Sequence, residues 1–140
     1  MVRPLPGDQV LIWLIKHAMA AIMPRSAELP GILDTDLDGF LRRMHEDADA
    51  LYWTGLVMSA VVYAISPLLT VFVPLPSFLL PAKLRALHTE RLLSHPLYLL
   101  RQAGYLVRLS AGMCWGADPT VRAKFALAPY PADPGTFRTS

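Results

Sequence analysis

Apolar residues recur at helical spacing near the start of the chain, from shortly after Asp8 to Met23. The pattern stops at Pro24, which the interior of a helix does not tolerate. Asp8 has the type of side chain that caps a helix N-terminus. The sequence therefore predicts a first helix over residues 8–23, followed by a loop over residues 24–33 that contains two prolines and a glycine.

Three aspartates, Asp34, Asp36 and Asp38, precede the next amphipathic stretch, and two arginines follow them. Acidic side chains in the first turn and basic side chains further along suit the dipole of a helix. We expect a second helix that opens with these aspartates and runs to about Leu51 or beyond.

The same aspartates match the opening of a calcium loop, in which ligands stand at positions one, three and five and glycine at six. The match then fails, because His45 occupies position twelve, where the bidentate glutamate belongs, and Arg42 occupies position nine. The sequence therefore favours helix capping over calcium binding.

No charged residue lies between Asp49 and Lys83. An apolar helix of about 20 residues is long enough to cross the hydrocarbon core of a bilayer. Pro67 lies in the middle of the segment and three more prolines lie at its far end, and each interrupts a helix. Two interpretations stay open: residues 50–80 span a bilayer, or they form a helix buried in the core or against a large partner.

The second half of the chain predicts further helices. An amphipathic pattern starts after Pro81 and ends at His95, which precedes a proline. A long helix is expected over residues 97–116. Asp118 as N-cap and Pro119 at the first helical position then predict a short helical turn.

These elements predict an all-α protein, a small helical bundle of about four to five helices. The chain of 140 residues contains no asparagine, so it lacks the Asn-Gly turns typical of hairpins, and its 13 prolines punctuate it often. We expect one helical domain over residues 1–128 and an extended, proline-rich tail over residues 129–140.

Composition bears on partners more than on fold. Hydrophobic residues make up 54% of the chain, more than in an ordinary soluble protein, so a partner surface or lipid is expected to cover part of them. Residues 1–50 carry 5 basic and 8 acidic side chains, and residues 51–140 carry 8 and 3. No basic run with interleaved aromatics is present, so we expect no nucleic-acid binding.

No catalytic, metal-binding or cofactor-binding set is predicted in this chain. Cys114 is the single cysteine, which excludes a disulfide within the chain, a CxxCH haem attachment and an iron–sulfur cluster held by its own thiolates. His88 and His95 are too few for zinc, which takes three or four ligands. His45 and Asp49 stand four residues apart, a spacing more typical of a solvated pair than of a catalytic dyad.

Six short motifs follow one another in a recognisable order: Met23-Pro24-Arg25, Pro30-Gly31, Asp34-Thr35-Asp36-Leu37-Asp38-Gly39-Phe40-Leu41, Phe78-Leu79-Leu80-Pro81, Leu97-Tyr98-Leu99-Leu100-Arg101 and Trp115-Gly116-Ala117-Asp118-Pro119-Thr120-Val121-Arg122. In this order they resemble the gluconate 2-dehydrogenase subunit 3 family, over nearly the whole chain. Two features depart from that family: its twin-arginine leader is missing, and the segment 126–130 lacks the usual Gly-Tyr.

The resemblance implies a non-catalytic accessory subunit of a large FAD-dependent dehydrogenase of the glucose–methanol–choline type, which oxidises an alcohol or sugar. FAD and the catalytic histidines would belong to the large subunit, and a cytochrome c subunit sometimes accepts the electrons. The resemblance also favours a membrane-associated location, or a periplasmic one reached by co-export with a partner, over a freely cytoplasmic one.

Residues of the last motif and the tail are the candidate partner interface: Trp115, Asp118, Pro119, Arg122 and Tyr130. Tryptophan and tyrosine combine an apolar body with one polar atom, which suits an interface. Asp118 has a second interpretation, as a helix cap. The alternative function is a small integral membrane tether that spans the bilayer through residues 50–80.

Overall fold

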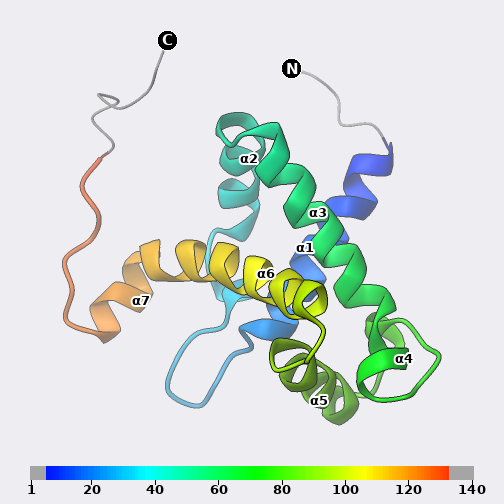
Figure 1. The fold of residues 1–140 in the computed structure, drawn as a ribbon. Helices are drawn as coiled ribbons and strands as arrows, with labels where there is room; N and C mark the ends of the chain where they lie inside the picture. The colour runs from blue at the N-terminus through cyan, green and yellow to red at the C-terminus, as the bar shows by residue number, and fades with distance from the viewer. Residues whose placement is uncertain (1–5, 133–140) are drawn as a thin grey trace.

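The computed structural model describes residues 6–132, and every regular element in that range is helical (Figure 1). The all-α prediction is therefore confirmed. Five of the seven α-helices are longer than six residues. The elements in order are α1 (Pro6–Ile22), the 3₁₀ turn η1 (Ile32–Asp34), α2 (Leu37–Asp47), α3 (Ala50–Ile65), α4 (Pro67–Thr70), the 3₁₀ turn η2 (Ser77–Leu79), α5 (Ala82–Leu93), α6 (Tyr98–Ala117) and α7 (Pro119–Lys124).

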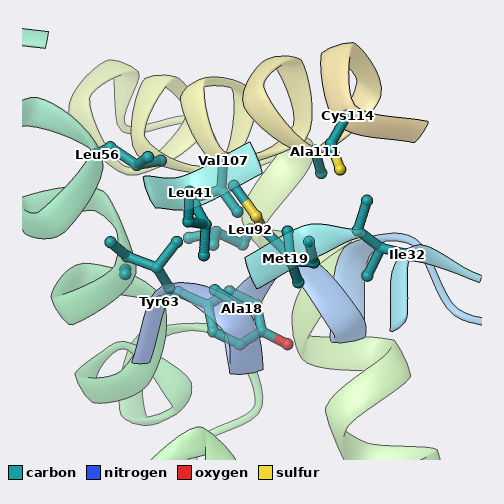
Figure 2. Packing of buried hydrophobic residues seen from close by; sticks show 13 residues of the cluster. Ala18, Met19, Ile32, Leu41, Leu56, Tyr63, Leu92, Val107, Ala111 and Cys114 are labelled. Carbon is teal, nitrogen blue, oxygen red and sulfur yellow. The ribbon is translucent and has the colours of Figure 1, made fainter. Parts of the chain in front are cut away.

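Helices α1, α3 and α6 enclose the hydrophobic core, and α5 packs against α6 (Figure 1). Met19, Leu56 and Val107, one from each of the three core helices, are fully buried and lie close together in Figure 2. The approach of α5 to α6 is close, because a Cβ atom added to Gly104 would lie 2.9 Å from a methyl carbon of Leu93. A larger residue at 104 would therefore force the side chain of Leu93 to shift.

The first two helix boundaries differ from the sequence prediction. Helix α1 begins at Pro6, so Asp8 lies in its first turn and is not the N-cap. A proline is tolerated in a first turn, and a carboxylate there still interacts favourably with the helix dipole. The second helix also starts later than expected, since Asp36 is the N-cap of α2 and its carboxylate accepts a hydrogen bond from the backbone N–H of Gly39 at 3.1 Å.

The prediction that the second helix runs to Leu51 is wrong. Helix α2 ends at Asp47, and α3 begins at Ala50. Ala48 and Asp49 between them have extended ψ angles of 152° and 142°. An acidic side chain is favourable at a helix N-terminus, so Asp49, the N-cap residue of α3, suits a new helix start better than the middle of one continuous helix.

The uncharged segment of residues 50–80 consists of three elements, α3, α4 and η2. Helix α3 ends where Pro67 removes a backbone donor, and α4 restarts at that proline. Within the described residues, no helix is both long and apolar enough to cross a membrane.

The remaining boundaries agree with the sequence. Helices α5, α6 and α7 lie within a residue or two of the predicted ranges. Residues 129–132 are exposed and have no regular secondary structure, and the prediction of an extended tail over 133–140 lies outside the described residues.

A buried histidine joins α5 to the end of α3. The Nε2 atom of His88 lies 2.9 Å from the carbonyl oxygen of Tyr63, and its Nδ1 atom lies 2.6 Å from the hydroxyl oxygen of Thr70. Because a carbonyl oxygen only accepts, Nε2 carries the proton and Nδ1 accepts from Thr70. Burial lowers the pKa of His88, so this neutral form is the one the fold stabilises.

The buried His88 makes stability depend on pH. Its pKa is lowered in the folded state, whereas an unfolded histidine titrates near about 6.5. Below that pH the unfolded chain binds a proton that folded His88 does not, so the free energy of unfolding falls as the pH drops towards the folded pKa. Thermal melting across this range should show that fall in the wild type and a smaller fall in His88→Gln.

His45→Gln is the matched control, because His45 is exposed, and it should keep the wild-type pH dependence. In mildly alkaline buffer His88→Gln should itself cost about 1–3 kcal/mol, since it disturbs two buried hydrogen bonds. Equal pH dependence in the wild type and His88→Gln would contradict the assignment.

Candidate partner interface

The corner between α6 and α7 is formed by a capped helix start. One carboxylate oxygen of Asp118 accepts hydrogen bonds from the backbone N–H groups of Thr120 at 2.9 Å and Val121 at 3.1 Å. Pro119, which has no N–H, stands at the first helical position. The buried side chain of Val121 fastens the short helix to the bundle. Asp118 therefore caps α7, as one of its two interpretations predicted.

Arg122 ties the tail to this corner. Its Nε atom donates to the carbonyl oxygen of Ala128 at 2.6 Å, and its guanidinium carbon lies 4.0 Å from the ring centroid of Tyr130. A second guanidinium nitrogen reaches the carbonyl oxygen of Gly116 at 3.4 Å. The chain reverses at Ala126, whose φ is +56°. Arg122 thus holds the end of α6 and the tail together.

Trp115 holds the loop of residues 24–33 against α6. Its indole N–H donates to the carbonyl oxygen of Pro30 at 2.8 Å, and its ring meets Phe125 edge to face. A hollow of about 370 Å³ lies between this loop and α7. At its edge Arg25 pairs with Asp34, and the hydrogen bond between them lowers the pKa of Asp34 to about 2.

The structure therefore brings the predicted interface residues together in one corner, which we call the C-terminal corner and define as residues 115–130. Trp115, Asp118 and Arg122 each have a partner within the chain, so each has a structural role. Tyr130 is 63% exposed, although the guanidinium of Arg122 lies over one face of its ring. Figure 1 shows α7 and the tail standing away from α1, α3 and α5.

An apolar groove on the outer face of α6 was missed by the sequence analysis. It has a volume of about 730 Å³ and is lined by Met23, Gln102, Tyr105, Leu106, Arg108, Leu109, Gly112 and Met113. A Cβ atom on Gly112 would meet no atom within 4 Å, so no side chain of the described chain covers the groove there. Leu109 is 59% exposed.

The signal for this groove was present in the sequence. The core face of α6 carries Ala103, Val107, Ser110, Ala111 and Cys114, all buried. The apolar residues Tyr98, Tyr105, Leu109 and Met113 recur at intervals of seven, four and four on the other side and are exposed. A helix that is apolar on both faces is expected to have a second partner.

The other candidate metal-binding residues do not come together in the structure. Asp34 pairs with Arg25, Asp36 caps α2, and Asp38 lies 2.7 Å from Lys16, so the three carboxylates serve three partners. His95 accepts a hydrogen bond from the backbone N–H of Leu97 at its Nδ1 atom. In the described part of the chain, no three His, Cys, Asp or Glu side chains gather as a metal site would require.

Cys114 is a packed thiol. It is buried, its sulfur lies 3.4 Å from the hydroxyl oxygen of Thr35, and burial raises its pKa. A thiol with a raised pKa is largely protonated at neutral pH, and the protonated form is a poor nucleophile. The geometry therefore supports packing as the role of Cys114.

The sequence matches no protein-family model, no curated protein and no solved structure at a significant level. The resemblance to the gluconate 2-dehydrogenase subunit 3 family thus stays a prediction, and it enters below only as support for a proposal.

The capping role of Asp118 predicts a specific pattern of stability. Asp118→Ala removes the acceptor for two backbone N–H groups and should cost about 1 kcal/mol in denaturant unfolding. Asp118→Asn keeps a side-chain oxygen in the same place and should cost much less. If the two variants lose equal stability, the carboxylate charge and not the hydrogen-bond acceptor is what matters.

The contacts of Arg122 predict that the tail is released when its side chain is removed. Arg122→Ala loses a hydrogen bond to Ala128 and a cation–π contact of about 1 kcal/mol, so chymotrypsin should cleave after the exposed Leu127 about fivefold faster or more. Lys124→Ala, in the same short helix and also cationic, is the control and should leave the cleavage rate unchanged. An unchanged rate in Arg122→Ala would show that the tail is not held by this residue.

Proposed function

We propose that this chain is a non-catalytic accessory subunit that binds and stabilises a large FAD-dependent dehydrogenase of the glucose–methanol–choline type. In this proposal FAD and the catalytic residues belong to the large subunit, whose substrate is an alcohol or sugar. The observation that carries the proposal is the uncovered apolar groove on α6.

The groove is suited to bind a protein segment. Its volume of about 730 Å³ lies in the range of ordinary binding pockets, but it is an open surface along a helix. Leu109 and Met113 on its walls are exposed apolar side chains, and Gly112 leaves room between them for close approach of another backbone. Apolar side chains gathered on one face are typical of a surface that a partner covers.

The C-terminal corner supports the same interpretation. Phe125, Leu127 and Tyr130 are exposed although all three are large and apolar or aromatic. Because Arg122 already holds the tail at Ala128 and Tyr130, less conformational entropy is lost when a partner covers it. The groove lies on α6, and the corner comprises the end of that helix and the residues that directly follow it.

The resemblance to the gluconate 2-dehydrogenase subunit 3 family names the class of partner. It also implies a cytochrome c subunit as a further member of the complex. The location that it implies is at a membrane, or in the periplasm after co-export with a partner. The match of motif order supports the flavoprotein over other large partners.

Co-expression with the open reading frames that neighbour the gene for this chain tests the proposal, which expects one of them to encode the flavoprotein. The two chains should purify together in near-stoichiometric amounts with the visible spectrum of a bound flavin. Leu109→Asp places a charge in the groove and should weaken the complex at least tenfold, since a charge buried without a partner costs several kcal/mol. Circular dichroism should show an unchanged fold, because Leu109 is exposed in the isolated chain.

Phe72→Ser is the matched control, because Phe72 is also an exposed apolar residue but lies outside the groove. It should leave co-purification of the flavoprotein intact. A stable monomer that never associates with a flavoprotein would overturn the proposal. If Leu109→Asp and the wild type bind the flavoprotein equally well, the groove is not the surface that binds it.

A further inference from the structure

A second apolar surface lies outside the groove and the C-terminal corner. We call residues 65–79 the apolar tip; they join the end of α3 to the start of α5 and form the lower right margin of the molecule in Figure 1, whereas α7 lies at the lower left. Its exposed large side chains are Ile65, Leu68, Leu69, Phe72, Leu75, Phe78 and Leu79. Trp13 of α1 extends this surface, since its ring lies against Phe78 at a centroid distance of 5.3 Å.

Phe72 is held in an unfavourable conformation and still points into solvent. Its φ is +58°, in the left-handed region that glycine adopts easily and a residue with a Cβ does not. Its side chain is 78% exposed, so its ring contributes little to packing. The backbone conformation of Phe72 costs free energy, and its exposed side chain adds little packing energy in return. This combination indicates that Phe72 contacts something other than the rest of this chain.

Two arginines of α5 fix both ends of the loop that carries Phe72. Arg91 donates to the carbonyl oxygen of Thr70 at 2.8 Å. Arg85 donates to the carbonyl oxygens of Ser77 at 3.1 Å and Leu80 at 2.8 Å. Residues 71–76 are thus clamped on each side, so the apolar tip presents its side chains without a further cost of ordering.

The charges that follow the apolar tip on α5 are mainly basic. No acidic residue lies between Asp49 and Glu90, and on α5 the three cations Lys83, Arg85 and Arg91 outnumber the single carboxylate of Glu90. Lys83 and Arg91 are exposed. Apolar side chains with cations beside them fit a bilayer surface, where acyl chains lie beneath anionic headgroups.

We propose that the apolar tip enters the surface of a bilayer with anionic headgroups, with Phe72 and its apolar neighbours among the upper acyl chains and the α5 cations at the level of the phosphates. The charge pattern favours lipid over a protein partner, because an array of anionic headgroups attracts a net positive helix at any rotation of the protein about the membrane normal. This surface is separate from the α6 groove, so the inference does not depend on the flavoprotein partner.

Flotation of the purified chain with vesicles tests the proposal without any flavoprotein. The wild type should bind vesicles of phosphatidylcholine mixed with phosphatidylglycerol and bind pure phosphatidylcholine more weakly. Phe72→Ser should weaken binding about tenfold or more, from the apolar area that no longer leaves water. Lys83→Gln should weaken binding to the mixed vesicles about fivefold and leave binding to pure phosphatidylcholine nearly unchanged.

Tryptophan fluorescence provides a second measurement of vesicle binding. Phe72→Trp should shift its fluorescence to shorter wavelength when mixed vesicles are added, because the indole leaves water. Because native Trp13 also lies at the tip, the shift of Phe72→Trp should exceed that of the wild type, whereas Leu109→Trp, exposed in the groove of α6, should shift no more than the wild type does. Phe72→Gly separates a lipid contact from a folding role, since it relieves the backbone strain: its melting temperature should stay equal or rise while vesicle binding is lost.

Three results would overturn the proposal: no binding of the wild type to either vesicle, equal binding by Phe72→Ser and the wild type, or loss of flavoprotein co-purification in Phe72→Ser. The last would assign the apolar tip to a protein partner. Leu109→Ser, which should bind vesicles as the wild type does, distinguishes failure of this proposal from failure of the accessory-subunit proposal.

Discussion

The carbonyl oxygen of Tyr63 has no partner within its own helix, because the residue four positions later is Pro67, which has no N–H. The Nε2 atom of the buried His88 donates to that oxygen, and Thr70 donates to the other nitrogen of the ring. This set of hydrogen bonds allows α3 to end inside the protein without an unpaired carbonyl. The position of α5 and the course of residues 65–79 both follow from it, since His88 connects α5 to the end of α3 and to α4.

Helix α6 is the second element on which the arrangement depends. One face buries Val107 and Ala111 in the core, and Gly104 allows α5 to approach closely. The other face keeps Leu109 and Met113 in solvent. A helix with two apolar faces in a chain this small cannot satisfy both by itself, because the described chain has no further layer to cover the outer one. The many apolar residues of the sequence therefore lie partly in the core and partly on surfaces that the described chain leaves uncovered.

The sequence predicted the helical class and most boundaries because periodicity and prolines act locally. It placed α5, α6 and α7 well, since Pro81, the His95-Pro96 pair and Asp118 punctuate the chain at those points. It missed the break after Asp47 because an acidic helix terminus is a weak local signal. It also grouped Trp115, Asp118 and Arg122 as interface residues. The capping role of Asp118 could be predicted locally, whereas the partners of Trp115 and Arg122, at Pro30 and Ala128, became visible only with the tertiary structure. The groove around Gly112 could be predicted only by assigning the two faces of α6 separately.

The apolar tip and the α6 groove differ in ways that suit different partners. The groove is a hollow whose floor at Gly112 admits another backbone, and its walls combine apolar side chains with Gln102 and Arg108. A hollow of fixed shape selects a partner of complementary shape, which a lipid surface does not have. The tip carries apolar side chains around Phe72 and is clamped by Arg85 and Arg91, so it needs only a soft apolar layer beneath an anionic surface. The two proposals therefore assign the two surfaces to partners of different chemistry, a shaped protein segment for the groove and a bilayer surface for the tip.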